Sequence, residues 1–293
     1  MTDRDVNWGA RLFVGLQYLL PQHALSRLMY RLARVTAAPF NGWMIRAYVR
    51  LVGVDLSLAA EPNLSAYPHL AAFFTRALRP EVRPMDPDPA AVLSPVDGTI
   101  SQIGTIADGR IIQAKGHDYS VSELLGGDTD AHRRFDGGTF ATIYLSPRDY
   151  HRIHMPLAGD LDEMTYLGGR LFSVNRMTAQ RVPGLFARNE RVVCWFGTDA
   201  GPMALVLVGA IFVGGIETVW AGEVAPAGDG PRRRRWDYTD KAPPLHLGRG
   251  EEMGRFNLGS TIVLLFPAGA VTWDATLAPG ATVRLGQRIG TRG

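Results

Sequence analysis

The stretch RFNLGSTIVLLF at residues 255–266 decides how this chain is to be interpreted. Its second part, from Thr261 to Phe266, is apolar and rich in β-branched residues, a pattern that predicts a buried strand. The part before it is polar and predicts a loop. The glycyl-serine bond between Gly259 and Ser260 therefore lies where a loop enters a strand.

This bond carries the elements of a self-cleavage reaction. Gly259 has no Cβ, so its carbonyl carbon is open to attack and its backbone can be twisted at low cost. Ser260 places a hydroxyl beside that carbonyl, and a base that removes the hydroxyl proton would let Oγ convert the amide into an ester. A Gly-Ser pair before a strand is more often a serine that ends a loop, so the rest of the chain has to supply the base.

Composition describes an ordinary globular protein. The 293 residues are 46% apolar and 20% charged, which suits one large domain or two smaller ones. The 33 glycines and 19 prolines indicate many turns and favour a strand-rich fold. The single cysteine, Cys194, excludes an internal disulfide framework and fits a reducing compartment. We interpret it as a core residue of a strand.

The N-terminal segment differs from the rest of the chain in charge and in pattern. Residues 1–53 contain seven arginines and two aspartates, a net charge of +5 in a chain whose total is +3. Periodicity predicts amphipathic helices over 8–20, 22–35 and 41–52. Aromatic residues, among them Trp8 and Trp43, lie in the first and third of them.

Basic, aromatic and amphipathic helices favour a position in the interface of an anionic membrane. A helical subdomain packed on the core, or a nucleic-acid partner, is the alternative. No helix has the run of about 18 apolar residues that a span needs, and the charged start predicts no signal peptide. We expect a membrane-associating segment over 1–62 and a catalytic domain over 63–293.

Beyond residue 90 the pattern is one of short apolar runs between turns. It predicts an α+β, mainly β fold, with an antiparallel two-sheet core preceded by the N-terminal helices. The basic cluster at 232–235 is interpreted as a loop. The expected strands are 91–94, 99–106, 110–114, 139–145, 161–167, 191–197, 203–213, 215–220, 261–266 and 281–284, with short helices at 120–125 and 175–181.

Three polar residues are candidate partners of Ser260. Asp97 lies in a turn between two predicted strands, where aspartate usually serves turn geometry. His151 and His154 lie three residues apart in a predicted loop, from which both can reach one pocket. A His-x-x-His pair can ligate zinc, but the other histidines form no further ligand cluster, so we expect no metal. The other interpretation is a base for Ser260 oriented by Asp97.

Together with these candidates, the sequence motifs of the chain resemble those of a known family, the bacterial-type phosphatidylserine decarboxylase proenzymes, which depend on a pyruvoyl group. The resemblance covers most of residues 70–266. Its motifs are FFTR at 73–76, SPVDG at 94–98, PRDYHRIHMP at 147–156, LFSVN at 171–175, NER at 189–191, GA at 209–210, ETVWAG at 217–222 and EMGRFNLGST at 252–261.

The resemblance implies a role for each candidate. Asp97, His154 and Ser260 would drive cleavage between Gly259 and Ser260, which leaves chains 1–259 and 260–293 with a covalent pyruvoyl group derived from Ser260. His151 would donate a proton during turnover.

The resemblance also implies the reaction and its setting. The enzyme would convert phosphatidylserine to phosphatidylethanolamine and carbon dioxide in phospholipid biosynthesis, and it would be a homodimer. As a peripheral protein it would lie on an anionic membrane surface, the cytoplasmic face of the cell membrane. Ser173 and Asn175 are weaker candidates for holding the headgroup phosphate.

Other functions fit part of the pattern. A pyruvoyl-dependent decarboxylase of a soluble amino acid would share the serine-derived group but would need no interfacial helices. A serine hydrolase that uses Asp97, His154 and Ser260 would remain an intact chain. A non-catalytic membrane-binding β module would show neither cleavage nor activity.

Overall fold

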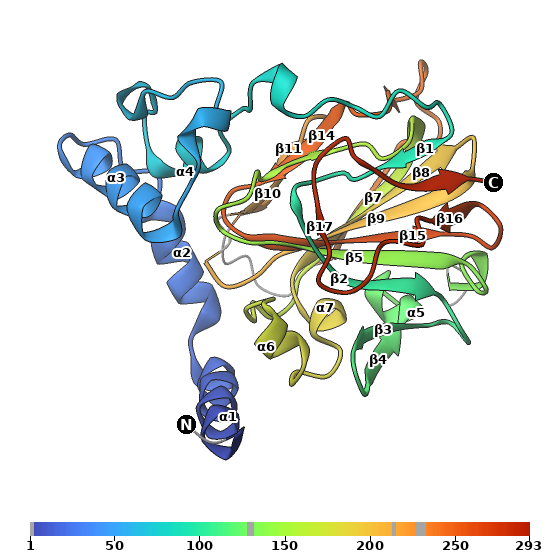
Figure 1. Cartoon of the computed structure of the whole chain (residues 1–293), viewed down its shortest axis with the longest axis horizontal. Helices are drawn as coiled ribbons and strands as arrows, with labels where there is room; N and C mark the ends of the chain where they lie inside the picture. Colours follow the sequence, from blue (N-terminus) through green and yellow to red (C-terminus); the bar gives the residue numbers. More distant parts are fainter. Residues whose placement is uncertain (1–2, 128–131, 213–214, 227–232) are drawn as a thin grey trace.

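A nine-stranded antiparallel sheet runs through the body of the protein in the computed structural model, which describes residues 3–127, 132–212, 215–226 and 233–293 (Figure 1). Its strand order is β12-β7-β8-β9-β15-β5-β2-β17, with β13 paired to β7. The strands are β2 (Gly98–Thr105), β5 (Thr139–Leu145), β7 (Gly159–Leu167), β8 (Arg191–Thr198), β9 (Gly201–Val208), β12 (Arg233–Asp237), β13 (His246–Leu247), β15 (Ser260–Phe266) and β17 (Thr282–Val283).

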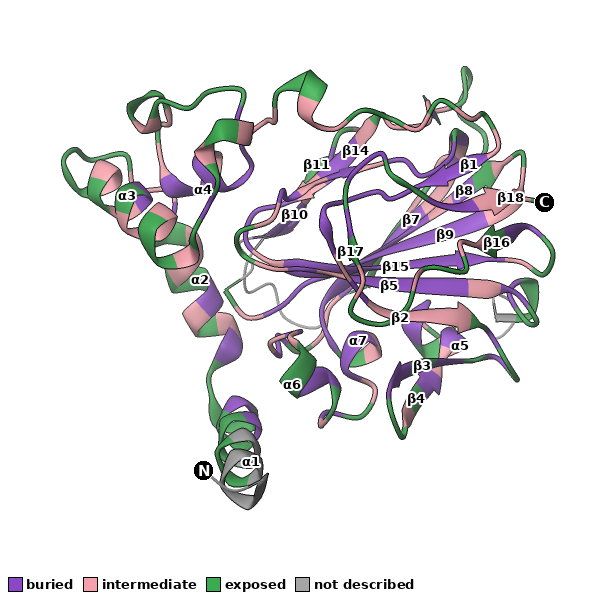
Figure 2. Ribbon diagram, viewed as in Figure 1, coloured by how far each residue is buried: buried purple, intermediate pink, exposed green. Residues whose placement is uncertain are grey.

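The strand predicted from residues 261–266 is a central strand of this sheet. β15 pairs with β5 on one side and with β9 on the other, and all seven of its residues are buried. A strand covered on both faces reads as a continuous apolar run, because neither face meets water. Figure 2 shows the same result as a band of buried strands through the middle of the body.

Three smaller sheets complete the body, and every strand pairing is antiparallel in the part of the chain that the structure describes. The prediction of a mainly β, antiparallel fold is confirmed. The four-stranded sheet has the order β11-β10-β14-β6, with β6 (Arg152–His154), β10 (Gly215–Thr218), β11 (Gly222–Pro226) and β14 (Glu252–Phe256). The others are β1-β18-β16, with β1 (Ala91–Leu93), β16 (Val271–Trp273) and β18 (Arg288–Arg292), and the hairpin of β3 (Arg110–Ala114) and β4 (His117–Ser120).

The three predicted N-terminal helices are present and form an arm along one side of the body (Figure 1). Their bounds are α1 (Asp3–Leu19), α2 (Gln22–Leu32) and α3 (Phe40–Val52), followed by the short α4 (Leu70–Phe74). Pro21 separates the first two, as its missing N–H requires. The body carries α5 (Val121–Leu124), α6 (Arg176–Ala179) and α7 (Leu185–Arg188).

A small second core lies within the helical part. Ala33, Ile45, Val54 and four residues of α4 are buried there, together with Leu258 from the segment before β15. The predicted division between 1–62 and 63–293 stays a prediction, although this core places α4 with the helices. The candidate cleavage segment thus packs directly against the helical part.

Two local predictions are wrong. Arg233, Arg234 and Arg235 lie in strand β12, not in a loop, whereas Arg232 is outside the described residues. β12 is an edge strand, and charged side chains suit an edge because they oppose pairing with other chains. The histidine segment is likewise not all loop, since β6 runs from Arg152 to His154 and pairs with β14.

Candidate active site

One end of the nine-stranded sheet collects most of the predicted site residues. β15 begins there at Ser260, opposite Leu145, the last residue of β5. Thr261 faces Val208, where β9 ends. β2 begins at the same end, directly after Asp97. Because alternate antiparallel strands begin where their neighbours end, loops far apart in sequence meet around Ser260.

The Gly259–Ser260 bond has the local geometry that the sequence predicted. Gly259 has a φ of +50°, a left-handed conformation that glycine adopts at little cost. A Cβ at this position would meet nothing within 4 Å, so the requirement for glycine here is conformational. Ser260 is 1% exposed, and its Oγ is buried without a hydrogen-bond partner in the described parts of the chain. A buried hydroxyl without a partner is uncommon and calls for an explanation.

His154 is held as a base at its Nε2 atom. Its Nδ1 lies 2.8 Å from the carbonyl oxygen of Gly250, which can only accept, so Nδ1 carries the proton. The lone pair on Nε2 then accepts a hydrogen bond from the Tyr150 hydroxyl at 3.2 Å. Burial lowers the pKa of His154. The hydrogen bond to Gly250 and the nearby carboxylates of Glu252 and Asp97 raise it, but burial is the larger effect. The imidazole is therefore neutral and able to take up a proton.

His151 is fully buried on the side of the helical part. Its Nδ1 donates to the carbonyl oxygen of Asp149 at 2.9 Å, and its ring centroid lies 4.1 Å from that of Phe74. Its Nε2 is buried and has no partner within the described ranges. Burial lowers the pKa of His151 to about 3. The carbonyl of His151 accepts from the amide of Phe256, so the residue lies beside the segment that leads to Ser260.

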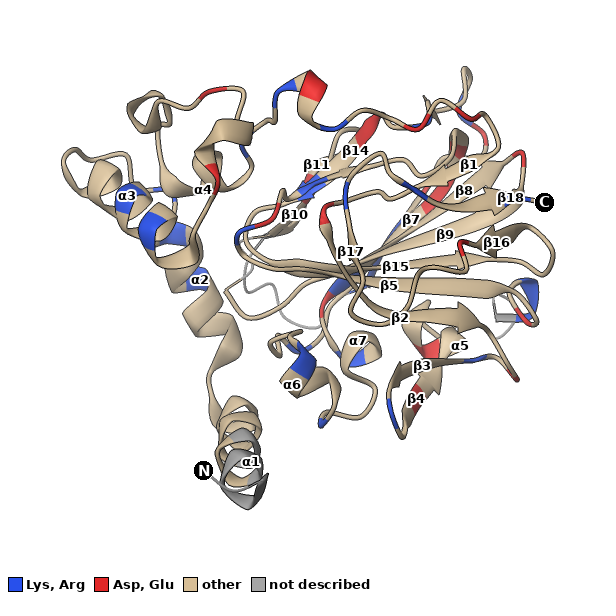
Figure 3. Ribbon diagram, viewed as in Figure 1, with Lys and Arg blue, Asp and Glu red and all other residues tan. Residues whose placement is uncertain are grey.

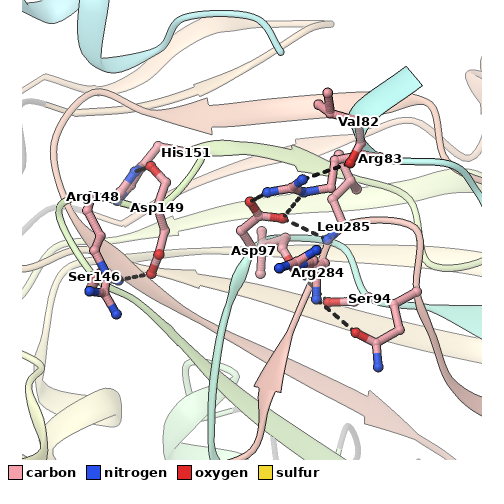
Figure 4. A network of polar contacts seen from close by, with 12 residues as sticks. Val82, Arg83, Ser94, Asp97, Ser146, Arg148, Asp149, His151, Arg284 and Leu285 are labelled. Atoms are coloured by element: carbon pink, nitrogen blue, oxygen red, sulfur yellow. Dashed lines mark hydrogen bonds and ion pairs between the residues drawn. The ribbon is translucent and has the colours of Figure 1, made fainter. Parts of the chain in front are cut away.

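Asp97 does not hydrogen-bond to His154. Its Oδ1 accepts from Arg83 Nε at 2.7 Å and from the Leu285 amide at 2.9 Å, and its Oδ2 accepts from Arg83 Nη2 at 2.5 Å (Figure 4). Both side chains of this ion pair are nearly buried, at 10% and 11% exposure. The carbonyl of Gly250 sets the His154 tautomer, which is the task expected of Asp97.

No hydrogen bond joins any two of Asp97, His154 and Ser260 within the described residues. They are nevertheless neighbours, because the amide of His154 donates to the carbonyl of Pro95, two residues before Asp97. Asp97 is also one of the charges that act on the pKa of His154. Their catalytic roles stay predictions.

The two weaker candidates lie in the loop after β7. The Asn175 Oδ1 caps α6 by accepting from the amide of Thr178 at 3.1 Å. The amide of Ser173 donates to Gln17 Oε1 of α1 at 2.8 Å. These contacts explain both positions structurally, through a helix cap and a tie to the N-terminal arm, and their role in substrate binding stays a prediction.

A cavity of about 150 Å³ lies between the helical part and the histidine segment. Sequence reasoning did not single out three of its charged or polar residues, Arg76, Arg83 and Tyr150. Arg76 and Tyr150 lie inside the motifs FFTR and PRDYHRIHMP, and this position in the sequence could have marked both as candidate site residues. The cavity is lined by Gly53, Asp55, Leu58, Arg76, Leu78, Arg83, Asp97, Arg148, Asp149 and Tyr150.

Nowhere in the described residues do three or more His, Cys, Asp or Glu side chains lie so that they could hold one metal ion. The two histidines instead use their Nδ1 atoms on backbone carbonyls.

Known proteins resemble the chain over nearly its whole length. A family model described as phosphatidylserine decarboxylase matches residues 70–291, and one described as PSD matches residues 12–51. The phosphatidylserine decarboxylase proenzyme of Azotobacter vinelandii is 55% identical over 282 residues, 96% of this chain and 98% of its own length. The proenzyme of Pseudomonas fluorescens is 56% identical over 96% of this chain and 97% of its own, and that of Marinobacter nauticus 54% over the same shares.

Proposed function

The chain belongs to the phosphatidylserine decarboxylase family, and we propose that it cleaves itself between Gly259 and Ser260 and then converts phosphatidylserine to phosphatidylethanolamine and carbon dioxide. One observation carries the proposal. A buried serine hydroxyl with no hydrogen-bond partner among the described residues follows a glycine of positive φ at the start of a central strand. A serine that merely ended a loop would be expected to bond its hydroxyl to the turn.

Maturation uses residues that the chain itself supplies. His154 Nε2 takes the Ser260 hydroxyl proton, and Oγ attacks the carbonyl carbon of Gly259. The C–N bond breaks as the amide becomes an ester, and the nitrogen gains a proton. Loss of the serine α-proton then expels the Gly259 carboxylate and leaves dehydroalanine. Water hydrolyses its imine tautomer, which releases ammonia and leaves a pyruvoyl group at position 260.

Two carboxylates near His154 favour the first step, while the charge of Arg152 opposes it. The imidazolium formed in that step is stabilised by the carboxylates of Asp97 and Glu252, both of which act on the His154 pKa in the raising direction. The Tyr150 hydroxyl has to leave Nε2 before that atom can accept the Ser260 proton, because one lone pair serves one donor.

The surroundings of Ser260 fit a pyruvoyl group. Ser260 Oγ leaves with the Gly259 carboxylate when the group forms, and within the described residues this buried atom makes no hydrogen bond that its departure would break. When present, this group supplies an electron-accepting carbonyl for the substrate amine. We assign to His151 the proton transfer at the substrate α-carbon. Its Nε2 has no hydrogen-bond partner within the described residues, and the carbonyl of Asp149 accepts from its Nδ1 and orients the ring. Its low pKa means that it has to gain a proton before it can donate one.

The two chains are expected to stay together after cleavage. β15 would open the smaller chain, 260–293, and it pairs with strands of the larger chain on both sides. Five fully buried apolar residues of β15 contribute about 8–15 kcal/mol of burial energy. Cleavage of one peptide bond at the end of the strand removes none of these contacts.

The N-terminal arm supports a location on a membrane surface. Most of the large apolar side chains exposed in the described residues belong to α1–α3 and the turns beside them, including Trp8, Leu19, Trp43 and Leu51 at 60–85% exposure. Arg27, Arg31, Arg46 and Arg50 are exposed on the same arm (Figure 3). No helix among the described residues is long and apolar enough to cross a membrane.

These features fit a peripheral enzyme on an anionic surface such as the cytoplasmic face of the cell membrane. The enzyme would reach the headgroup there while the acyl chains stay in the bilayer. The family resemblance extends the proposal to a homodimer.

Carbon dioxide release from vesicles tests the function. Phosphatidylserine vesicles should yield carbon dioxide and phosphatidylethanolamine, and Ser260→Ala should yield neither. Release from free serine but not from the lipid would identify a decarboxylase of a soluble amino acid. An intact chain that a fluorophosphonate labels at Ser260 would identify a serine hydrolase.

A further inference from the structure

Arg76 is a buried cation without a carboxylate partner in the described parts of the chain. It follows α4 and is 4% exposed. Its guanidinium reaches the carbonyl oxygens of Phe74 at 3.5 Å and Arg148 at 3.3 Å, and it lies 5.2 Å from the ring centroid of Phe73. Its Nε is buried and makes no hydrogen bond. Burying a charge with so few partners is costly, so the arrangement calls for an explanation.

Three carboxylates line the 150 Å³ cavity together with Arg76, and each of them has another hydrogen-bond partner than Arg76. Asp97 is paired with Arg83 through both of its oxygens. Asp149 Oδ2 accepts from the amide of Ser146 at 2.7 Å, and Asp55 Oδ1 accepts from Ser57. Arg148, an exposed residue, adds a second cation to the lining. The lining thus holds three arginines and three aspartates, and among the described residues Arg76 is its buried cation with no carboxylate in direct contact.

The cavity borders the predicted chemistry. Its lining residues Arg148, Asp149 and Tyr150 directly precede His151, and the carbonyl of Asp149 orients that ring. Tyr150 donates to His154. The carbonyl of Thr75, next to Arg76, accepts from Arg152 Nε at 2.9 Å, which joins this segment to the strand that carries His154. A ligand in the cavity would thus lie between the helical arm and the segment that carries both histidines.

We propose that Arg76, assisted by Arg148, binds the phosphate of the lipid headgroup in this cavity. The inference rests on the proposed function, to which it adds a binding site. Guanidinium matches phosphate oxygens in geometry and remains charged when buried, which makes arginine the preferred partner for them. The cavity lies against α3, whose C-terminal Gly53 lines it, so a bound headgroup would sit beside the arm that faces the lipid.

Phosphate is the better assignment than the serine carboxylate for a chemical reason. The carboxylate has to lose its charge as carbon dioxide departs. A cation held against it would stabilise the ground state more than the transition state and would slow the reaction. The phosphate keeps its charge throughout, so the same cation can hold the substrate at no cost to the chemical step.

Binding to the uncleaved chain tests this without any turnover. In a Ser260→Ala background, O-phosphoethanolamine should bind to the chain. Arg76→Lys should raise its dissociation constant on the order of 10- to 100-fold, because the loss of one hydrogen bond to a charged group changes affinity by about that factor. L-serine, which has a carboxylate and no phosphate, should bind much more weakly. Arg79→Lys is the matched control, because Arg79 is an exposed residue that pairs with Glu81, and it should change nothing.

Arg148→Gln keeps the test independent of folding, because Arg148 is exposed and its loss should weaken O-phosphoethanolamine binding by a few fold. Equal binding of O-phosphoethanolamine to the parent, Arg76→Lys and Arg148→Gln would overturn the proposal. Serine binding that depends on Arg76 would assign the site to the carboxylate instead and would also overturn it.

In the chain with Ser260 intact, Arg76→Lys should still self-cleave, and its KM for phosphatidylserine should rise more than its kcat falls. An unchanged KM would contradict the site while leaving the proposed function in place. A parent chain that neither cleaved nor released carbon dioxide would contradict the proposed function, whatever it bound.

Discussion

Replacing Arg83 by methionine should destabilise the protein through the carboxylate that it leaves behind. Arg83→Met keeps much of the side-chain stem but removes both hydrogen bonds to Asp97, whose only other side-chain hydrogen bond within the described residues comes from the Leu285 amide. Both side chains are about nine-tenths buried, so solvent screens the pair little. Removing one partner of a buried ion pair costs about 3–5 kcal/mol, and the remaining amide bond places the expectation near the lower end, at about 3 kcal/mol.

Urea unfolding in a Ser260→Ala background measures this change on a single, uncleaved chain. Arg79→Met is the control. Its pair with Glu81 is exposed, at 48% and 66%, and should contribute less than about 1 kcal/mol. The double variant Arg83→Met with Asp97→Leu should recover much of the loss, since it leaves no unpaired charge. A loss below about 1 kcal/mol for Arg83→Met would refute the reasoning that Arg83 neutralises Asp97.

The remaining predictions concern the histidines, pH and the membrane. His154→Ala should leave an uncleaved, inactive chain on a denaturing gel, whereas His151→Ala should cleave normally and lose on the order of 10²–10⁴-fold in carbon dioxide release; the reverse pattern would exchange their roles. Between the His151 pKa of about 3 in the folded chain and 6.5 in the unfolded chain, the unfolded chain binds more protons, so stability should fall as the pH falls. In a Ser260→Ala background, His151→Gln should lower the slope of the free energy of unfolding against pH by up to about 1.4 kcal/mol per pH unit. An unchanged slope would contradict the burial of a neutral His151. Arg31→Glu, Arg46→Glu and Arg50→Glu together should weaken cosedimentation with anionic vesicles, and salt should weaken it further. Arg134→Glu is the control, because Arg134 lies beyond the opposite end of the large sheet. Equal binding to neutral and anionic vesicles at every salt concentration would count against membrane docking.

The choice of arginines for the vesicle experiment comes from the structure. Arg34 belongs to the same basic helix pattern, but its Nη2 is paired with Glu223 of β11 at 3.1 Å. Glu223 also accepts from Tyr30, so this side chain ties α2 to the body. A charge reversal at Arg34 would disturb that tie as well as any lipid contact. Sequence periodicity alone could not separate it from Arg31.

Long, regular patterns predicted the fold well. The apolar run 139–145 coincides with β5, and the three N-terminal helices lie where the hydrophobic periodicity predicted them. In such segments the hydrophobic pattern continues over several helical turns or along a whole strand. The short strand β6 was missed because it has three residues, two of them charged or polar, and exists through its pairing with β14. β12 was missed because an edge strand need not be apolar.

The candidate site was predictable where its chemistry is local in sequence. Gly259 and Ser260 are adjacent, and the positive φ of the glycine follows from the sharp entry into a buried strand. The Arg83–Asp97 pair and the Gly250 carbonyl on His154 were not predictable. They depend on how separate loops meet at one end of the sheet, and neither a loop arginine nor a backbone carbonyl has a sequence signature for that contact.

Self-cleavage is measured most directly by the mass of each chain in purified protein under denaturing conditions. We expect two chains divided between Gly259 and Ser260, with the smaller one blocked by a pyruvoyl group at its first residue, and a single uncleaved chain for Ser260→Ala. An active preparation that consisted of one unmodified chain of 32.0 kDa would contradict self-cleavage.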